Sequence, residues 1–253
     1  MPKVIILGSS NAVPTIEHEN THLVIVGDER TILVDCVSTP VVRLEQAGVD
    51  FNSLTDIVIT HFHPDHVAGV PLLLMDMWLM GRSKPINIYG LHNTMDKLEA
   101  LMGFYGWDEW PNFFPVGFYR LPAAEFAPVL DCAEFNVRSS PVHHMIPTIG
   151  LRVECKKIGK VLAYSCDTEP CEQTVRLSDG ADILIHEAAG ATFGHSSAEQ
   201  AGEIAAKAEA DKLYLIHYPS GRYAKGDLDL VAEAKKNYAG EVILATDFMT
   251  IDL

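Results

Sequence analysis

Short runs of apolar and β-branched residues recur along this chain, separated by segments with helical periodicity. Strands are predicted near residues 4–7, 23–26, 31–34, 56–60, 86–89, 134–138, 150–155, 160–164, 182–185, 212–216 and 241–245. Helices are predicted near residues 39–47, 67–80, 93–102, 198–208 and 228–238. Strands come first, helices are interleaved, and a second set of strands follows. This order favours an α/β fold with two sheets.

Local signals refine the boundaries of these elements. Asn93 or Thr94 is the expected N-cap of the helix that follows, and Ser196 to Glu199 has the pattern of a capping box. The chain has no recognisable linker, repeat or low-complexity segment. We therefore expect a single domain over residues 1–253.

Periodicity fails between residues 103 and 128, where aromatic side chains crowd together. They are Phe104, Tyr105, Trp107, Trp110, Phe113, Phe114, Phe118 and Tyr119. We interpret them first as packing residues of the domain. A wall of a substrate pocket and a contact between subunits are the alternatives that the sequence leaves open.

Composition is that of an ordinary globular protein, with 48% hydrophobic residues. The longest apolar segment, Val67 to Met80, contains Pro71 and Asp76 and is shorter than the roughly 18 residues of a membrane span, so we expect no membrane association. The N-terminal residues lack the apolar core of a signal peptide. The five cysteines are odd in number and show no Cys-x-x-Cys spacing, which indicates reduced thiols and a cytoplasmic protein.

Charge narrows the choice of substrate. The formal net charge is −15, with 34 acidic against 19 basic residues. Proteins that grip nucleic acid along its phosphates usually present a basic face. Long polyanions are therefore disfavoured as substrates, unless a partner subunit or bound metals compensate.

Residues that can bind metal are concentrated in one stretch, Thr60-His61-Phe62-His63-Pro64-Asp65-His66, at the end of a predicted buried strand. Pro64 prevents a helix from starting earlier, so three imidazoles and a carboxylate follow the strand end closely. Imidazole and carboxylate groups are ligands of Zn²⁺, Mn²⁺ and Fe. This spacing predicts a metal site.

Later strands also end in residues that can bind metal. These residues are His143 and His144, Asp167, His186 and Glu187, and His217. One such histidine alone is usually structural, but several in one chain favour a common sheet edge where they converge. Asp35, at the end of the third strand, is either a turn residue or a support for the histidine stretch.

The pattern His61-x-His63-x-Asp65-His66, followed by His144, Asp167 and His217, resembles the metallo-β-lactamase superfamily. More narrowly, the chain is similar to the RNase Z-like phosphodiesterases. The supporting stretches are Leu7-Gly8-Ser9-Ser10-Asn11-Ala12-Val13-Pro14, His144-Met145-Ile146-Pro147-Thr148-Ile149-Gly150, Tyr164-Ser165-Cys166-Asp167-Thr168, His186-Glu187-Ala188 and His195-Ser196-Ser197. The resemblance implies an αββα sandwich of two mixed sheets flanked by helices, with metals at the sheet edge.

Residue by residue, the resemblance implies two divalent metal ions, with zinc expected and manganese or iron as alternatives. His61, His63 and His144 would bind the first ion, Asp65, His66 and His217 the second, and Asp167 would bridge them. Asp65 would also accept a proton from a metal-bridging water. His195 would act on the leaving group, and Glu187 would orient His195. His143 is the competing choice for His144, and the spacing to Pro147 and Gly150 favours His144.

The chain departs from the tRNA-maturing members of this group in three places. The long Gly- and Pro-rich arm between the His144-type and Asp167-type ligands is replaced by the turn Lys156-Lys157-Ile158-Gly159. The tail after the last histidine, His217-Tyr218-Pro219-Ser220-Gly221-Arg222-Tyr223, is one residue longer than usual. Gly8-Ser9-Ser10 replaces a more glycine-rich loop. With the negative charge, these departures favour a small-molecule phosphodiester, such as a cyclic nucleotide, over pre-tRNA.

We therefore expect a dinuclear metal-dependent phosphodiesterase. The alternatives are an RNase Z-type endoribonuclease, a hydrolase of another ester (lactone, aryl sulfate or thioester) on the same site, and a metal-binding scaffold without catalysis. The intact ligand pattern argues against the scaffold. Because members of this group usually form dimers, a homodimer is also expected, with the stretch 104–119 as a possible contact.

Overall fold

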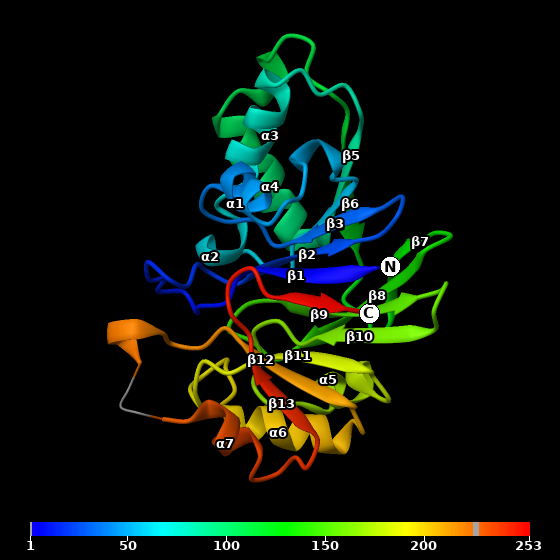
Figure 1. Ribbon diagram of the computed structural model, residues 1–253. Coiled ribbons are helices and arrows are strands. Elements are labelled where there is room, and N and C mark those ends of the chain that lie inside the picture. Colours follow the sequence, from blue (N-terminus) through cyan, green and yellow to red (C-terminus); the bar gives the residue numbers. More distant parts are fainter. Residues whose placement is uncertain (1, 225–227) are drawn as a thin grey trace.

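The computed structural model describes residues 2–224 and 228–253. In it, two sheets pack face to face between two layers of helices (Figure 1). In spatial order the first sheet contains β14 (Thr250–Asp252), β1 (Lys3–Gly8), β2 (His22–Val26), β3 (Thr31–Val34), β4 (Asp56–Val58), β5 (Ile86–Leu91) and β6 (Val116–Leu121). The second contains β13 (Glu241–Leu244), β12 (Lys212–Ile216), β11 (Ile183–Glu187), β10 (Lys160–Tyr164), β9 (Thr148–Cys155), β8 (Phe135–Val142) and β7 (Ala127–Asp131).

Both sheets mix parallel and antiparallel neighbours. In the first sheet β3, β4, β5 and β6 run parallel, whereas β14, β1, β2 and β3 pair antiparallel. In the second, β10 to β13 run parallel and β7 to β10 pair antiparallel. The predicted αββα sandwich with two mixed sheets is therefore confirmed.

Helices cover the outer face of each sheet. The helices on the side of the first sheet are α1 (Pro40–Gln46), α2 (Pro64–Val67), α3 (Val70–Leu79) and α4 (His92–Phe104). Those on the side of the second are α5 (Glu172–Ser178), α6 (Ala198–Lys207) and α7 (Leu230–Ala234). Short 3₁₀ helices lie at Phe51–Ser53, Trp107–Glu109 and Gly221–Tyr223. Among the described helices, none is both long and apolar enough to cross a membrane.

The strands are continuous apolar runs in the sequence because both of their faces are buried. In β1, Val4 and Ile6 face the core between the sheets, whereas Ile5 and Leu7 face the core beneath α1, α3 and α4. Successive strand side chains point to opposite faces, and here both faces are covered. Buried apolar side chains therefore pack against both faces of each sheet.

Several predicted boundaries were wrong. The helix expected over residues 67–80 is two helices, α2 and α3, because Gly69 packs against the backbone of Val37 and donates its N–H to the carbonyl of Cys36 at 2.8 Å. Helix α4 begins at His92 rather than after Asn93 or Thr94. The capping box consists of Ser197 and Gln200, one position later than the pattern suggested. Strands β6, β7 and β14 and helix α5 were not predicted.

Most of the aromatic stretch packs against the core. Phe114 is buried, and Trp110 stacks on Trp78 with ring centroids 5.0 Å apart. The Trp107, Phe113 and Phe118 rings are partly buried against the same core. Phe104 is different, being 88% exposed, as is its neighbour Tyr105 at 58%. Tyr119 is 48% exposed but stacks on Tyr89 with ring centroids 4.9 Å apart. The packing interpretation thus holds for most of the stretch but not for Phe104 and Tyr105.

Candidate metal centre

The predicted site residues lie at one end of the sandwich. The loops after β1, β11 and β12 meet there, at the left of Figure 1. The carboxyl ends of the parallel strands β3 and β4 share one edge of the first sheet, and those of the parallel strands β10 to β12 share one edge of the second. The two edges, expected as one, face each other: His63 Nδ1 lies 3.2 Å from His144 Nε2, and His61 Nε2 lies 3.9 Å from Asp167 Oδ2. The chain turns there from strand to loop or helix, so side chains from distant segments come together.

One cluster consists of His61, His63 and His144. His61 Nε2 lies 3.0 Å from His63 Nδ1, and His144 Nε2 lies 3.2 Å from the same atom. Four tetrahedral bonds of about 2.0–2.1 Å would place the nitrogens about 3.3 Å apart. Burial lowers the pKa of all three imidazoles, that of His61 most strongly, which favours neutral rings with lone pairs. The donor set fits a divalent cation.

A second cluster consists of Asp65, His66 and His217, whose ligand atoms lie within 4.8 Å of one another. His66 Nε2 is buried without a hydrogen-bond partner, and so is His217 Nδ1. The other ring nitrogen of His66, Nδ1, lies 2.7 Å from the carboxylate of Asp35. Although burial lowers the pKa of His66, Asp167 and Asp35 raise it well above its usual range. A positive charge on this ring, whether a proton or a metal ion, is therefore stabilised.

Asp167 lies between the two clusters. Its Oδ2 atom is 3.2 Å from His217 Nε2 and 3.4 Å from His66 Nε2. The same oxygen is 3.9 Å from His61 Nε2 and 4.0 Å from His144 Nε2. Burial opposes ionisation, but His217 and His66 outweigh it and hold the pKa of Asp167 well below its usual range. One ionised oxygen thus faces imidazoles of both clusters.

Asp35, which we considered as a support, is completely buried beneath the histidine stretch. Its carboxylate accepts hydrogen bonds from the backbone N–H and the hydroxyl of Thr60 in addition to its contact with His66. It therefore fixes the start of the stretch and one of its rings together. The sequence signal was only an aspartate at a strand end.

Three non-glycine residues at the site have left-handed backbone conformations: Asp35 with φ 61°, Cys166 with φ 54° and His217 with φ 56°. Each such conformation costs on the order of 1–3 kcal/mol and persists only where the surroundings enforce it. Cys166 Sγ lies 3.6 Å from His61 Nδ1, so this side chain packs beneath the first cluster. Strained residues at the ends of strands from both sheets, gathered around one site, are typical of a functional site.

His195 lies beside both clusters. Its ring is 4.9 Å from that of His144 and 5.8 Å from that of His217, between centroids. Its Nδ1 is 3.0 Å from Glu187, which is completely buried. Burial lowers the pKa of His195, but the hydrogen bond and charge of Glu187 raise it above the ordinary value overall.

The remaining candidate histidines lie elsewhere. The structure places His144 in the first cluster, whereas His143 belongs to none of the possible metal groups among the described residues. The His186 ring is buried and donates from Nδ1 to the carbonyl of Glu187. Burial lowers the pKa of His186 and of His22 to about 4, as expected for neutral structural rings.

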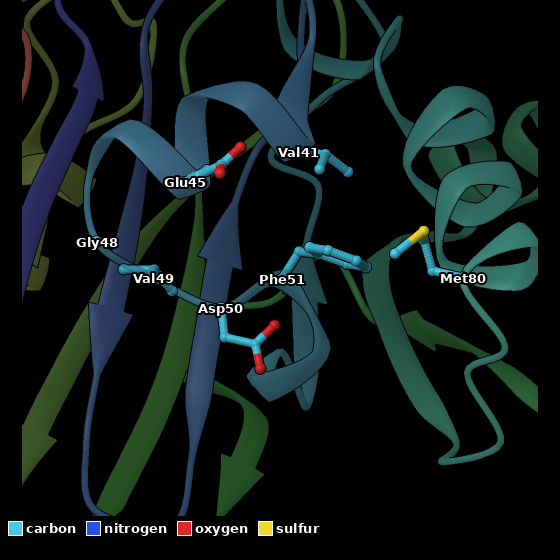
Figure 2. Close-up of a pocket in the computed structure, with 7 residues that line it drawn as sticks. All are labelled: Val41, Glu45, Gly48, Val49, Asp50, Phe51 and Met80. Atoms are coloured by element: carbon cyan, nitrogen blue, oxygen red, sulfur yellow. The ribbon is translucent and has the colours of Figure 1, made fainter.

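Two surface grooves lie outside the two clusters. The apolar groove of Figure 2, about 520 Å³, is lined by residues of α1, the Phe51–Ser53 helix and the end of α3, and includes none of the clustered residues. A second groove of about 470 Å³ runs between residues 14–17 and residues 221–222. None of the clustered residues lines it, but its two sides lie on the loops that follow β1 and β12, which are joined by the bond from the N–H of His217 to the carbonyl of Ser9.

Comparison with known proteins places the chain. Ribonuclease Z of Methanothermobacter thermautotrophicus is 26% identical over 309 residues, covering 100% of this chain and 97% of that protein. The short form of human tRNase Z superposes with a TM-score of 0.81 at 26% identity, covering 99% of this chain and 98% of the other. The metallo-β-lactamase fold protein YhfI from Bacillus subtilis has a TM-score of 0.83 at 22% identity, covering 98% of each chain.

The resemblance to RNase Z-like proteins of the metallo-β-lactamase superfamily is thereby confirmed, and so is the prediction of a metal-dependent hydrolase. A sequence model of one family within this group, described as "Anti-Pycsar protein Apyc1", matches residues 2–235. This chain is an RNase Z-like metal-dependent hydrolase that belongs to the Anti-Pycsar protein Apyc1 family.

Proposed function

We propose that this protein is a dinuclear phosphodiesterase. His61, His63 and His144 hold one divalent cation, Asp65, His66 and His217 hold the second, and Asp167 contacts both. The observation that carries this proposal is the position of Asp167 Oδ2, within 4.0 Å of imidazole nitrogens from both clusters. A single carboxylate oxygen in this position is suited to bridge two cations.

Two bound cations supply an activated water and neutralise charge on the phosphoryl oxygens. The protein's own groups then move the protons. Asp65, whose side chain is 15% exposed, accepts the proton of the attacking water. His195 donates a proton to the leaving oxygen, which its raised pKa favours. Glu187 keeps the His195 ring in place and stabilises its protonated form.

The substrate is proposed to be a small phosphodiester such as a cyclic nucleotide. Strands β9 and β10 are joined by residues 156–159 alone, which leaves no room for a tRNA-binding arm. The alignment with the Methanothermobacter enzyme spans 309 positions against 253 residues here, so that relative carries segments that this chain lacks. The net charge of −15 also disfavours a long polyanion.

The groove between residues 14–17 and 221–222, on the loops that follow β1 and β12, has a size that suits the same substrate class. Its volume of about 470 Å³ lies within the usual range of roughly 300–1,000 Å³ for small-molecule sites. Pro14 and Ile16 supply apolar surface, Thr15 supplies a hydroxyl, and the charged lining residues are one acid, Glu17, and one base, Arg222. This mixture suits a nucleoside attached to the phosphoryl group better than a run of phosphates.

Side-by-side assays test the proposal. The substrates are 3′,5′-cyclic nucleotides, bis(p-nitrophenyl) phosphate, an unprocessed tRNA transcript, an acyl lactone and an aryl sulfate. We expect turnover of the phosphodiesters, with the cyclic nucleotides preferred. Phosphodiester turnover no faster than with free metal would overturn the proposal, and efficient cleavage of the transcript would favour an endoribonuclease.

The metals are proposed to be zinc, with manganese and iron as the alternatives, because imidazole and carboxylate ligands accept all three. Elemental analysis of protein purified without added metal tests both identity and number. Two equivalents per chain support the dinuclear proposal, and one equivalent contradicts it.

We also propose a homodimer formed through the groove of Figure 2. Val41, Phe51 and Met80 line this groove, and Met80 and the adjacent Leu79 are more than half exposed. Covering this apolar surface with a second copy would remove it from water. Met80→Glu should then yield a monomer by light scattering. If Phe104→Glu alone gives a monomer, the contact lies at the end of α4 instead.

A cytoplasmic location and a single domain over residues 1–253 remain part of the proposal. The five cysteines are free thiols, four of them buried, which is consistent with a reducing compartment. Fractionation of cells that express the tagged protein, and limited proteolysis of the purified protein, would test the two statements separately.

A further inference from the structure

Glu169 lies two residues after Asp167 and connects three separate segments of the site. Its backbone N–H donates to the carbonyl of His143 at 2.7 Å, within an isolated antiparallel bridge between these two residues. Its side chain reaches the loop after β11, where the N–H of Gly194 donates to Glu169 Oε1 at 2.7 Å. One residue thus joins the segments that carry His144, Asp167 and His195.

The bond to Gly194 extends to His144. The carbonyl of Gly194 lies 2.7 Å from His144 Nδ1. A carbonyl can only accept, so Nδ1 carries the proton and Nε2 is left with its lone pair facing His63. Glu169 holds the peptide unit before Gly194, and the carbonyl of Gly194 in turn holds the ring of His144.

At Gly194 the loop packs closely against His144 and Met145. Its φ is +81°, and a Cβ atom built there would lie 2.9 Å from His144 Nδ1 and 3.0 Å from Met145 Cγ. His195 is the next residue, and its own N–H donates to the carbonyl of Thr192, inside the loop. The position of Gly194 therefore determines the position of His195 as well as the orientation of the His144 ring.

Apart from Gly194 and the contact of His195 with Glu187, the loop 190–195 makes few bonds to the rest of the described protein. Residues 191–193 are exposed, with Phe193 at 77%. The described N–H bonds of Gly190 and Thr192 run to Ser196 and Gly190, at the base of the loop or inside it. The bond from Gly194 to Glu169 is charge-assisted, and such bonds are about twice as strong as neutral ones.

We infer that Glu169 is a positioning residue, which holds the loop 190–195 so that His144 presents Nε2 to the first cation and His195 stays over the reacting group. The effect on His144 concerns metal affinity and does not depend on the substrate. The effect on His195 rests on the proposed phosphodiesterase function.

The test compares Glu169→Ala, Glu169→Asp and Glu169→Gln with Glu172→Ala, which removes an exposed carboxylate three residues away. Zn²⁺ affinity is measured by competition with a chromophoric chelator, and kcat and KM are measured on bis(p-nitrophenyl) phosphate. Glu169→Ala should weaken one zinc site by about 10–100-fold, as loss of a support behind a ligand does elsewhere. It should also lower kcat with little change in KM.

Glu169→Gln keeps an acceptor for the Gly194 N–H but loses the charge, so its zinc affinity should lie between those of wild type and Glu169→Ala. Glu169→Asp keeps the charge, but its side chain is one methylene too short to reach the Gly194 N–H, so its zinc affinity should be as low as that of Glu169→Ala. If Glu169→Ala does not fold, Glu169→Asp still tests the inference. Wild-type zinc affinity in both Ala and Asp variants overturns the inference. If the wild type cleaves no phosphodiester while Glu169→Asp still loses zinc, only the proposed function fails.

Discussion

His195 Nδ1 lies 3.0 Å from the carboxylate of Glu187, which is itself completely buried. That carboxylate also accepts the backbone N–H groups of Thr168 and Ala189, so strand β11 and two turns hold it in place. The contact with Glu187 consequently fixes the His195 ring through Nδ1, and Nε2 remains to exchange a proton with a substrate. This arrangement supports the proposal that His195 moves a proton while the other clustered histidines hold metal.

His195→Ala should lower kcat on phosphodiesters by at least about 100-fold, because general acid catalysis contributes roughly 10²–10⁴ in rate. Bound metal should be unchanged, since His61, His63 and His144 form a complete set without it. Steady-state kinetics and elemental analysis of the same preparation check both statements. Loss of one metal equivalent would place His195 among the ligands, as its proximity to His144 and Asp167 also permits.

Glu187→Gln should shift the pH profile of kcat. Glu187 raises the pKa of His195, so the protonated, proton-donating form persists to higher pH than for an ordinary histidine. Removing the negative charge lowers that pKa, and the descending limb of the profile should move to lower pH. In His195→Ala the limb should be absent. A profile identical to wild type in Glu187→Gln would show that another group sets the limb.

Asp35→Ala should weaken the second cation site by about 10–100-fold, because the carboxylate lies 2.7 Å from His66 Nδ1 and orients that ring. Asp56 offers a matched control, since it is also a buried carboxylate on the first sheet but pairs with Arg30 at 3.2 Å. Asp56→Ala should lower the free energy of unfolding and leave zinc affinity unchanged. If Asp35→Ala binds zinc as tightly as Asp56→Ala does, Asp35 does not support the metal centre.

The parts of the site that could be predicted are those encoded locally. His61, His63, Asp65 and His66 come from one stretch, whereas Asp167 follows a strand of the other sheet and was assigned to the site through the resemblance to the metallo-β-lactamase superfamily. His144 was preferred over His143 on spacing alone, and the structure places it in the cluster. Whether these residues bind metal stays a prediction.

What could not be predicted depends on packing between distant segments. Gly69 breaks the helix after the histidine stretch because it meets the backbone of Val37, and no local signal marks that contact. Glu169 and Gly194 meet only because the loop after β11 folds back over His144. Strand β6 lies at a sheet edge, where its side chains lose the strict alternation that identifies a strand.

Two helical glycines predict opposite effects of the same substitution. A Cβ at Gly202 in α6 would lie 2.1 Å from the carbonyl oxygen of Ala234 in α7, so Gly202→Ala must push the helices apart and should cost about 1–3 kcal/mol of stability. At Gly103 in α4 nothing lies within 4 Å, and Gly103→Ala should stabilise by about 0.5–1 kcal/mol through helix propensity. Urea titrations at equal metal loading compare the two, because bound metal itself adds stability. If Gly202→Ala were as stable as wild type, the close approach of α6 and α7 would be wrong.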